Sequence, residues 1–404
     1  MQNYLFHKSV PNKVTNISNI KMYSLFLLAA SLLPAIVASH PSPACTTSVV
    51  TGFESVQGPV TINNSPLDSF ENPKLSAVNE TAWEYWYFDS VSSDGESGVA
   101  VTFFKDPSVS FLGFGNLRVG LDAVWSNGTK FSTMLFVNES AVTKCGDITQ
   151  GVWNTTSQGI IFSFQVSKKL KQVQIVVSGP EISGTFSIKS KDPARYPGGE
   201  LYPSPAASLA LAPLIYWNEA IPAGTVNVNM SLGGTPFTLS GVGGHERNYA
   251  PFIWDFLVKQ WYWMRAVAGP YTMVLWVWES AIDSKTYTSA FLSEKGKEIF
   301  ATTNGTASSG GKYATMSLLN GAGVRGSFGD NSTGISVDLV DHDCSKSWHF
   351  ELQHQNVAFE APAGINQQYS RFVNTVSGGE VGHKIWKGVA SSEQNHVLVP
   401  IPLP

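Results

Sequence analysis

Charge is the scarcest feature of this 404-residue sequence. Only 14% of its residues are charged, whereas globular domains usually contain about 25%. The net charge is −4 at pH 7, and the lysines and arginines form no long run. A nucleic acid or an anionic membrane surface is therefore not expected as a partner.

Cysteine is also rare. The sequence has three, Cys45, Cys145 and Cys344, which allow at most one internal disulfide and leave its pairing open. Disulfides therefore cannot carry the fold, and we expect stability to come from a hydrophobic core, which a chain of this length can bury.

Several patterns that mark common enzymes are missing. The sequence contains no Gly-x-Ser-x-Gly, no His-Glu-x-x-His and no Cys-x-x-Cys. No motif therefore supports a hydrolase, a zinc protease or a zinc ribbon. Residues 321–326 match Gly-x-Gly-x-x-Gly, but a loop rich in Gly, Asn and Ser follows in place of a helix, which indicates a turn. We expect neither a metal nor a cofactor.

Long apolar runs are absent except near the start. Residues 22–39 read as a signal peptide, because an apolar stretch from Leu25 to Ala38 ends in small residues and is too short to span a bilayer of roughly 30 Å. Residues 1–21 then form an upstream leader or a gene-model artefact. The protein is therefore predicted to be secreted or to reside in the secretory-pathway lumen. Glycosylation is predicted at the sequons Asn79, Asn127, Asn138, Asn154, Asn229, Asn304 and Asn331.

Helical periodicity is almost absent as well. The segments are short β-rich runs bounded by Gly, Asn, Asp or Ser, which predicts an all-β protein of antiparallel barrel or sandwich type. Residues 84–88 and 261–265 each contain an aromatic run followed by a Gly-containing turn and an apolar run. This repeated pattern predicts two halves, an N-terminal domain over 40–255 and a C-terminal domain over 256–404.

The aromatic run of the first half carries rings on both faces. Side chains alternate along a strand, so Glu84, Trp86 and Phe88 lie on one face and Tyr85 and Tyr87 on the other. Such a strand must be covered on both sides, by core or by a cavity walled with flat rings. Glu84 should be paired or should meet a ligand, because burying an unpaired carboxylate is costly.

A Gly-rich segment, residues 241–249, holds consecutive polar side chains. In a structural interpretation, Arg247 forms an ion pair with Glu246 or Glu84 while His245 lies at a pocket edge. In a functional interpretation, His245 and Arg247 donate hydrogen bonds to a bound carbonyl. Arg265 ends an aromatic strand and has the same two interpretations.

The run Thr81 to Asp89, TAWEYWYFD, resembles the opening strand of the fungal Diels-Alderases, which are similar to hydroxyneurosporene synthase-like double-lipocalin proteins. Further similarity lies in residues 244–251, 262–271, 378–382 and 386–390. The resemblance extends from about residue 67 to residue 394.

The resemblance implies two lipocalin-like β domains with a ligand pocket in or between them, and a cofactor-free pericyclic cyclisation of apolar small molecules. The predicted export favours the hetero-Diels-Alderases of tropolonic sesquiterpene pathways, in which a tropolone quinone methide meets a humulene-type alkene. Alternatives are a decalin-forming intramolecular Diels-Alderase, a hydratase or isomerase in which Glu84 or Glu246 protonates an alkene, and a non-catalytic secreted carrier of an apolar metabolite.

Two groups of residues form the predicted site. Family members use an acidic residue of the opening motif, which corresponds to Glu84, whereas His245 departs from the apolar residue of decalin-forming relatives. The predicted catalytic residues are Glu84, His245, Arg247 and Arg265. The predicted substrate-binding residues are Trp86, Phe88, Tyr249, Trp261 and Trp263.

Overall fold

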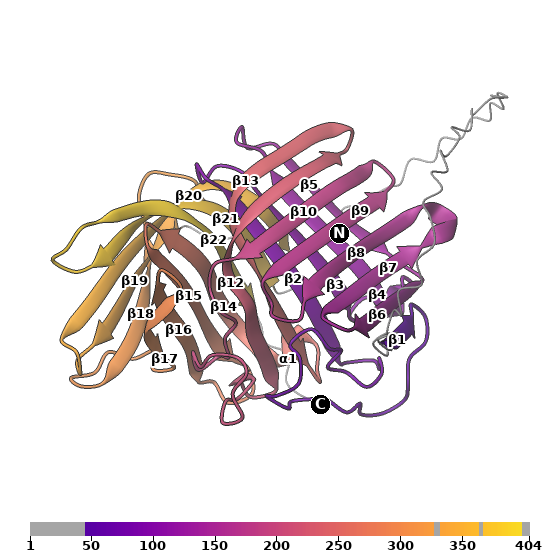
Figure 1. The fold of residues 1–404 in the computed structure, drawn as a ribbon, viewed down its shortest axis with the longest axis horizontal. Helices are drawn as coiled ribbons and strands as arrows, with labels where there is room; N and C mark the ends of the chain where they lie inside the picture. The colour runs from indigo at the N-terminus through magenta and orange to yellow at the C-terminus, as the bar shows by residue number, and fades with distance from the viewer. Residues whose placement is uncertain (1–44, 327–331, 363–366, 398–404) are drawn as a thin grey trace, which may run out of the picture. The chain divides into compact units, whose positions relative to one another are not determined.

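The computed structural model describes residues 45–326, 332–362 and 367–397. The predicted leader and signal peptide, residues 1–39, and the sequon at Asn331 lie outside the described residues. Strands dominate, and all of them belong to two antiparallel sheets (Figure 1). The all-β prediction is therefore confirmed.

The first sheet has 13 strands, with β1, β6 to β10, β12, β13, β2, β3, β4 and β5 in spatial order and β11 paired to β12. Its strands are β1 (Thr46–Thr51), β2 (Trp83–Ser92), β3 (Gly98–Lys105), β4 (Leu117–Val124), β5 (Lys130–Phe136), β6 (Glu139–Cys145), β7 (Ile148–Thr155), β8 (Ile160–Ser167), β9 (Gln172–Gly179), β10 (Ile182–Ser190), β11 (Ala210–Ala212), β12 (Ile215–Leu232) and β13 (Thr235–Ala250).

The second sheet has nine strands in the spatial order β17, β16, β15, β14, β22, β21, β20, β19 and β18. Their bounds are β14 (Val258–Ala268), β15 (Tyr271–Ser280), β16 (Thr286–Glu294), β17 (Lys297–Thr302), β18 (Lys312–Leu319), β19 (Gly334–Asp341), β20 (Lys346–Pro362), β21 (Gln367–Glu380) and β22 (Trp386–Val397).

Helical structure is limited to short turns. These are α1 (Trp254–Leu257) and the 3₁₀ turns η1 (Ser110–Leu112) and η2 (Thr156–Gln158). Over the described ranges, no helix has the length and apolar character needed to cross a bilayer.

The local sequence explains how the strands are covered. In β8 and β9 buried and exposed residues alternate, as expected for a strand with one face toward a core. In β2 all ten residues are buried, so this strand is covered on both faces. The aromatic strands β2 and β14 each pair with the following apolar strand, β3 and β15, as the sequence predicts.

The predicted domain boundary falls between the sheets in the sequence. The first sheet ends at Ala250 and the second begins at Val258. The described residues nevertheless belong to one compact unit, so the division into domains at residue 255 stays a prediction. Side chains of the two sheets pack together in a cluster that includes Tyr87 of β2 and Trp263 of β14.

One disulfide joins the start of β1 to the end of β6. Thr46 lies opposite Lys144 in this strand pair, which brings Cys45 and Cys145 together as the bonded pair. Cys344 is exposed and forms no disulfide. The sequence had left this pairing open.

Candidate functional site

Strand β2 presents different chemistry on its two faces. Trp86 and Phe88 point into the core of the first sheet, where the ring of Phe164 lies within 6 Å of each of them. Tyr85 and Tyr87 point the other way and line a cavity. The strand is thus covered by solid core on one face and by a cavity on the other.

The cavity has a volume of about 460 Å³, which suits a small-molecule ligand. Both sheets and α1 supply flat rings to its walls. Six of these rings belong to Tyr85, Tyr87, Trp254, Trp261, Trp263 and Trp276. Rigid aromatic walls favour apolar reactants and hold them at little cost in conformational entropy.

One part of the cavity wall is charged. Arg371 of β21 contacts Glu393 at 2.9 Å and Asp122 at 3.1 Å, and the hydroxyl of Tyr87 donates a hydrogen bond of 2.8 Å to Glu393. All four residues line the cavity. Burial holds the pKa of Tyr87 well above its usual value. The charges of Glu393 and Asp89 also raise this pKa, whereas Arg371 lowers it. The hydroxyl therefore remains a hydrogen-bond donor.

Glu246 of β13 brings a buried carboxyl group to the same cavity. Burial raises its pKa well above the usual value, and the neighbouring carboxyl of Glu219 adds to the shift, while Arg265 opposes it. The indole nitrogen of Trp217 donates a hydrogen bond of 3.1 Å to Glu246 Oε2. A carboxyl group whose pKa is raised takes up a proton more readily, and its protonated form can donate a hydrogen bond.

Glu84 and Arg247, two predicted catalytic residues, form a buried ion-pair network on the core side of the sheet. Glu84 accepts hydrogen bonds from Lys105 at 2.8 Å, from Arg247 at 3.0 Å and from the backbone N–H of Lys74 at 2.7 Å. The guanidinium of Arg247 also donates to the carbonyl oxygens of Tyr85, at 2.9 Å, and of residues 70 and 72. This matches the structural interpretation of an Arg247–Glu84 ion pair.

His245 is equally enclosed. Its Nδ1 donates to the carbonyl oxygen of Tyr87 at 2.9 Å, its Nε2 lies 2.9 Å from the carboxylate of Glu71, and its ring stacks on Phe88. The cavity-lining residues of the described chain do not include Glu84, His245, Arg247, Trp86 or Phe88. Their geometry favours a structural role, and we leave them out of the proposed site.

Arg265 connects the two sheets beside the cavity. From β14 it forms ion pairs with Asp89 of β2 and, at 2.9 Å, with Glu219 of β12. It also lies 3.8 Å from Glu246, so it acts on the cavity through that carboxyl group. Arg265 itself is not among the described residues that line the cavity.

The predicted substrate-binding residues separate in the same way. Trp261 and Trp263 line the cavity, as a substrate-binding role requires. Tyr249 is fully buried against the ring of Tyr216, at 5.2 Å between centroids, and lies outside the lining residues. The candidate site therefore includes the predicted residues Trp261 and Trp263 of β14 but not Trp86 and Phe88, which lie on the core face of β2.

Sequence reasoning missed most of the polar cavity residues. Tyr85 and Tyr87 were recognised as the opposite face of β2, but nothing in one sequence shows which face meets a cavity. Arg371 and Glu393 belong to β21 and β22, more than a hundred residues from β14 in the sequence, and carry no motif. Glu246 was predicted only as a possible ion-pair partner of Arg247 or as an alternative proton donor.

The predicted glycosylation sites differ in exposure. Asn127, Asn138, Asn229 and Asn304 are exposed and Asn154 is half-buried. Asn79 is buried; its Nδ2 donates to the carbonyl of Gly58, and its Oδ1 accepts from the backbone N–H groups of Thr81 and Ala82. A glycan on Asn79 would disrupt this arrangement.

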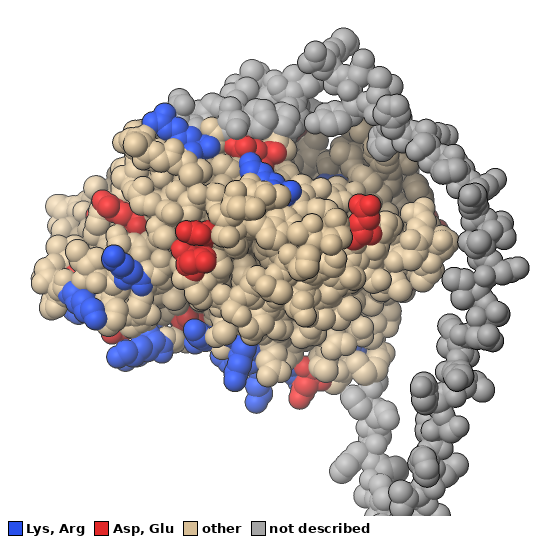
Figure 2. All heavy atoms as spheres, turned by 90° about the horizontal axis from the view of Figure 1, so that it is seen from above, with Lys and Arg blue, Asp and Glu red and all other residues tan. Residues whose placement is uncertain are grey.

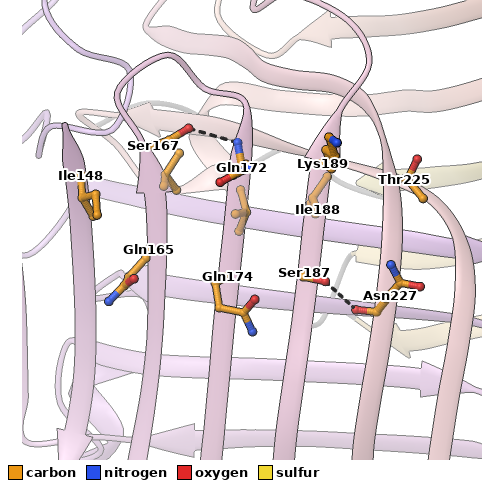
Figure 3. A pocket seen from close by; sticks show the side chains of 12 residues that line it. Ile148, Gln165, Ser167, Gln172, Gln174, Ser187, Ile188, Lys189, Thr225 and Asn227 are labelled. Atoms are coloured by element: carbon orange, nitrogen blue, oxygen red, sulfur yellow. Dashed lines mark hydrogen bonds between the residues drawn. The ribbon is translucent and has the colours of Figure 1, made fainter.

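A second hollow, of about 400 Å³, lies on the first sheet and has a different character (Figure 3). Gln165, Gln174, Ser187 and Asn227 lie opposite one another on β8, β9, β10 and β12. These are short polar side chains on the exposed face of the sheet, and no buried polar group points to a ligand. We therefore place the functional site in the aromatic cavity.

The charged surface residues agree with the composition. On the face shown in Figure 2, Lys and Arg are interspersed with Asp and Glu, and neither sign gathers into a patch.

Comparison with known proteins gives consistent matches. A family model described as Diels-Alderase-like matches residues 42–400. Diels-Alderase poxQ of Penicillium oxalicum is 35% identical over 341 residues, 83% of this chain and 75% of that protein. Diels-Alderase cheD of Chaetomium globosum is 34% identical over 355 residues, 87% of this chain and 84% of that protein.

A solved structure shows the same fold. The crystal structure of CghA with Sch210972 matches with a TM-score of 0.75 at 24% identity, covering 88% of this chain and 99% of that chain.

Proposed function

The chain belongs to the Diels-Alderase-like family, and we propose that it catalyses a cofactor-free hetero-Diels-Alder cycloaddition in the aromatic cavity between β2, β14 and β22. The names of its relatives support a pericyclase. The observation that carries the proposal is a cavity whose wall combines flat rings, such as those of Trp261 and Trp263, with polar side chains such as Glu246.

A cycloaddition requires no nucleophile. Three π bonds are consumed, two σ bonds form and one new π bond appears, so no group leaves and no proton is needed. An enzyme accelerates such a step by holding both reactants in one geometry and by excluding water from a reactive partner. The rings of Tyr85, Trp261 and Trp263 supply both effects.

The proposed reactants are a tropolone quinone methide and a humulene-type sesquiterpene. The heterodiene, O=C–C=C, would form one C–O and one C–C bond with the alkene and give a dihydropyran. The alkene partner would lie against the tryptophans. Glu246, in its protonated state, would donate to the heterodiene oxygen and lower the barrier by about 2 to 4 kcal/mol, by analogy with oxyanion-hole donors.

We further propose that the protein acts in the secretory pathway or outside the cell. The predicted signal peptide and the four exposed sequons, Asn127, Asn138, Asn229 and Asn304, support this location.

The test is a rate measurement with the purified mature chain. With a quinone-methide precursor and a humulene-type alcohol, we expect faster dihydropyran formation and one dominant stereoisomer compared with buffer. Trp263→Ala should lower turnover about tenfold or more, because the wall that orients the alkene is lost. The matched control is Trp386→Ala, since Trp386 is half-buried and does not line the cavity.

Three outcomes would contradict the proposal. If the protein binds the reactants but the rate and the stereochemistry equal those measured in buffer, the protein is a carrier. Cyclisation of a linear polyene to a decalin, without reaction of the quinone methide, would keep the pericyclase and reject the heterodiene. Equal losses in Trp263→Ala and Trp386→Ala would assign Trp263 to stability.

A further inference from the structure

The loop between β3 and β4 exposes apolar side chains to solvent. Phe111 is 81% exposed, Leu112 58% and Phe114 48%, although such residues are usually buried. The segment from residue 107 to residue 117 contains no ionisable side chain. We call Phe111, Leu112 and Phe114 the apolar tip.

The apolar tip is held on an ordered turn. The backbone N–H of Asp106 donates to the carbonyl of Asn116 at 2.8 Å, and that of Gly113 donates to Ser110 at 2.8 Å. Gly113 has a φ of 83°, a conformation that favours glycine. Arg118 closes the base of the loop by an ion pair with Asp106. The exposed rings therefore belong to a defined turn.

The same loop forms part of the cavity wall. Ser108 and Val109, directly before η1, line the aromatic cavity. The ring of Phe114 stacks on Phe136 at 4.8 Å, and Met134, two residues earlier on β5, lines the cavity while remaining 46% exposed. An apolar surface thus continues from the tip to the cavity.

We propose that the apolar tip inserts into the interface of an uncharged lipid surface and that apolar reactants enter the cavity from there. The absence of ionisable side chains in the loop, with Arg118 and Asp106 neutralising each other at its base, matches a zwitterionic headgroup layer. A protein partner fits less well, because a stable interface needs about 800 Å² on each partner and three side chains present far less. Aromatic and aliphatic tips of this kind favour the membrane interface.

The proposal that the apolar tip contacts a membrane rests on the loop alone, whereas the proposal that reactants enter the cavity from the membrane also rests on the proposed function. The experiment therefore measures binding without turnover. The full mature chain is floated with phosphatidylcholine vesicles, and its partition is compared with that of Phe111→Ser/Leu112→Ser. The matched control is Val381→Ser/Ile385→Ser, because these two residues are also exposed, at 58% and 72%, but lie between β21 and β22.

We expect the chain to float with the vesicles, the tip variant to lose at least about tenfold in partition, and the control variant to bind as the unchanged chain does. Adding phosphatidylserine to the vesicles should change the partition of the protein little. Absence of vesicle binding, or equal losses in both variants, would overturn the proposal. So would a dimer in sedimentation velocity that the tip variant abolishes, since the tip would then contact a second copy. Vesicle binding by a chain without cycloaddition activity would reject the proposed function alone.

Discussion

Glu84 and Glu246 are both buried glutamates of the first sheet, yet their neighbours shift the pKa in opposite directions. Burial by itself raises the pKa of either carboxyl group. At Glu84 the cations of Lys105 and Arg247 outweigh burial and hold the pKa below its usual value. At Glu246 burial and Glu219 outweigh Arg265, so the pKa is raised. The cavity therefore receives the carboxyl group whose pKa is raised.

This difference predicts a pH dependence for the reaction. Activity should be full below the raised pKa of Glu246 and should fall as the pH rises through it, because the ionised carboxylate cannot donate to the heterodiene oxygen. Glu246→Gln retains a donor that does not titrate, so its profile should be flat and its activity within about fivefold of the parent. The measurement is kcat/KM against pH for both proteins.

The same variant separates the proposed cycloaddition from alkene protonation. A hydratase or isomerase needs a transferable proton, so Glu246→Gln would still bind the ligand but would lose turnover. If the parent and the variant instead share one pH profile, Glu246 is not the donor. The linked effect on stability has the same sign: because the pKa of Glu246 is raised in the folded chain, this group stabilises the fold below its ordinary pKa of 4.5, and that contribution is lost as the pH rises through the raised pKa.

At the scale of elements, β2 divides its side chains between two tasks. Phe88 packs on Phe164 and His245 in the core, whereas Tyr87 points to the cavity and donates to Glu393. Adjacent residues of one strand thus serve stability and the site separately, because successive side chains leave a strand on opposite faces.

Substitutions on the two faces of β2 should have different effects. Phe88→Ala should lower the free energy of unfolding by about 3 to 5 kcal/mol by leaving a core cavity, with little change in KM at a temperature where the chain is folded. Tyr87→Phe should cost about 1 kcal/mol of stability and reduce kcat/KM by about tenfold, because Arg371 and Glu393 lose their orientation. Denaturant unfolding and kinetics on both variants check this. Similar changes in both quantities for both variants would show that the faces are not separated.

At the scale of the whole molecule, neither sheet forms the cavity alone. Tyr87 and Glu246 come from the first sheet, and Trp263, Arg371 and Glu393 come from the second. The ion pairs of Arg265 with Asp89 and Glu219 join the sheets directly beside it. Breaking a buried pair of this kind costs about 3 to 5 kcal/mol, so the site depends on the joint packing of the two sheets.

Export and glycosylation also concern the whole chain. When the protein is secreted from a fungal host, we expect cleavage close after residue 39 and glycans on Asn127, Asn138, Asn229 and Asn304, because these side chains are exposed. Asn79 should remain unmodified, since its amide is buried and hydrogen-bonded. Peptide mapping after deglycosylation tests each site, with Asn79 as the internal control. Retention of the protein in the cytosol would contradict the predicted export.

The all-β class, the family and the importance of the aromatic strands could be predicted from the amino-acid sequence. These properties follow from local patterns: short β runs, rings at consecutive positions, and the TAWEYWYFD motif. Trp261 and Trp263 were also predicted as part of the site, because an aromatic strand beside a Gly-containing turn is visible in one segment.

Three features depend on how the strands pack in space: the face of β2 that meets the cavity, the ion pairs of Glu84 with Lys105 and Arg247, and the contacts that join Arg371 and Glu393 to Tyr87. Alternation shows that a strand has two faces but not what covers each of them. The cavity face of β2 is covered by strands more than a hundred residues away in the sequence, and the pKa of a buried carboxyl group depends on near neighbours such as Lys105 together with distant ones such as Arg247.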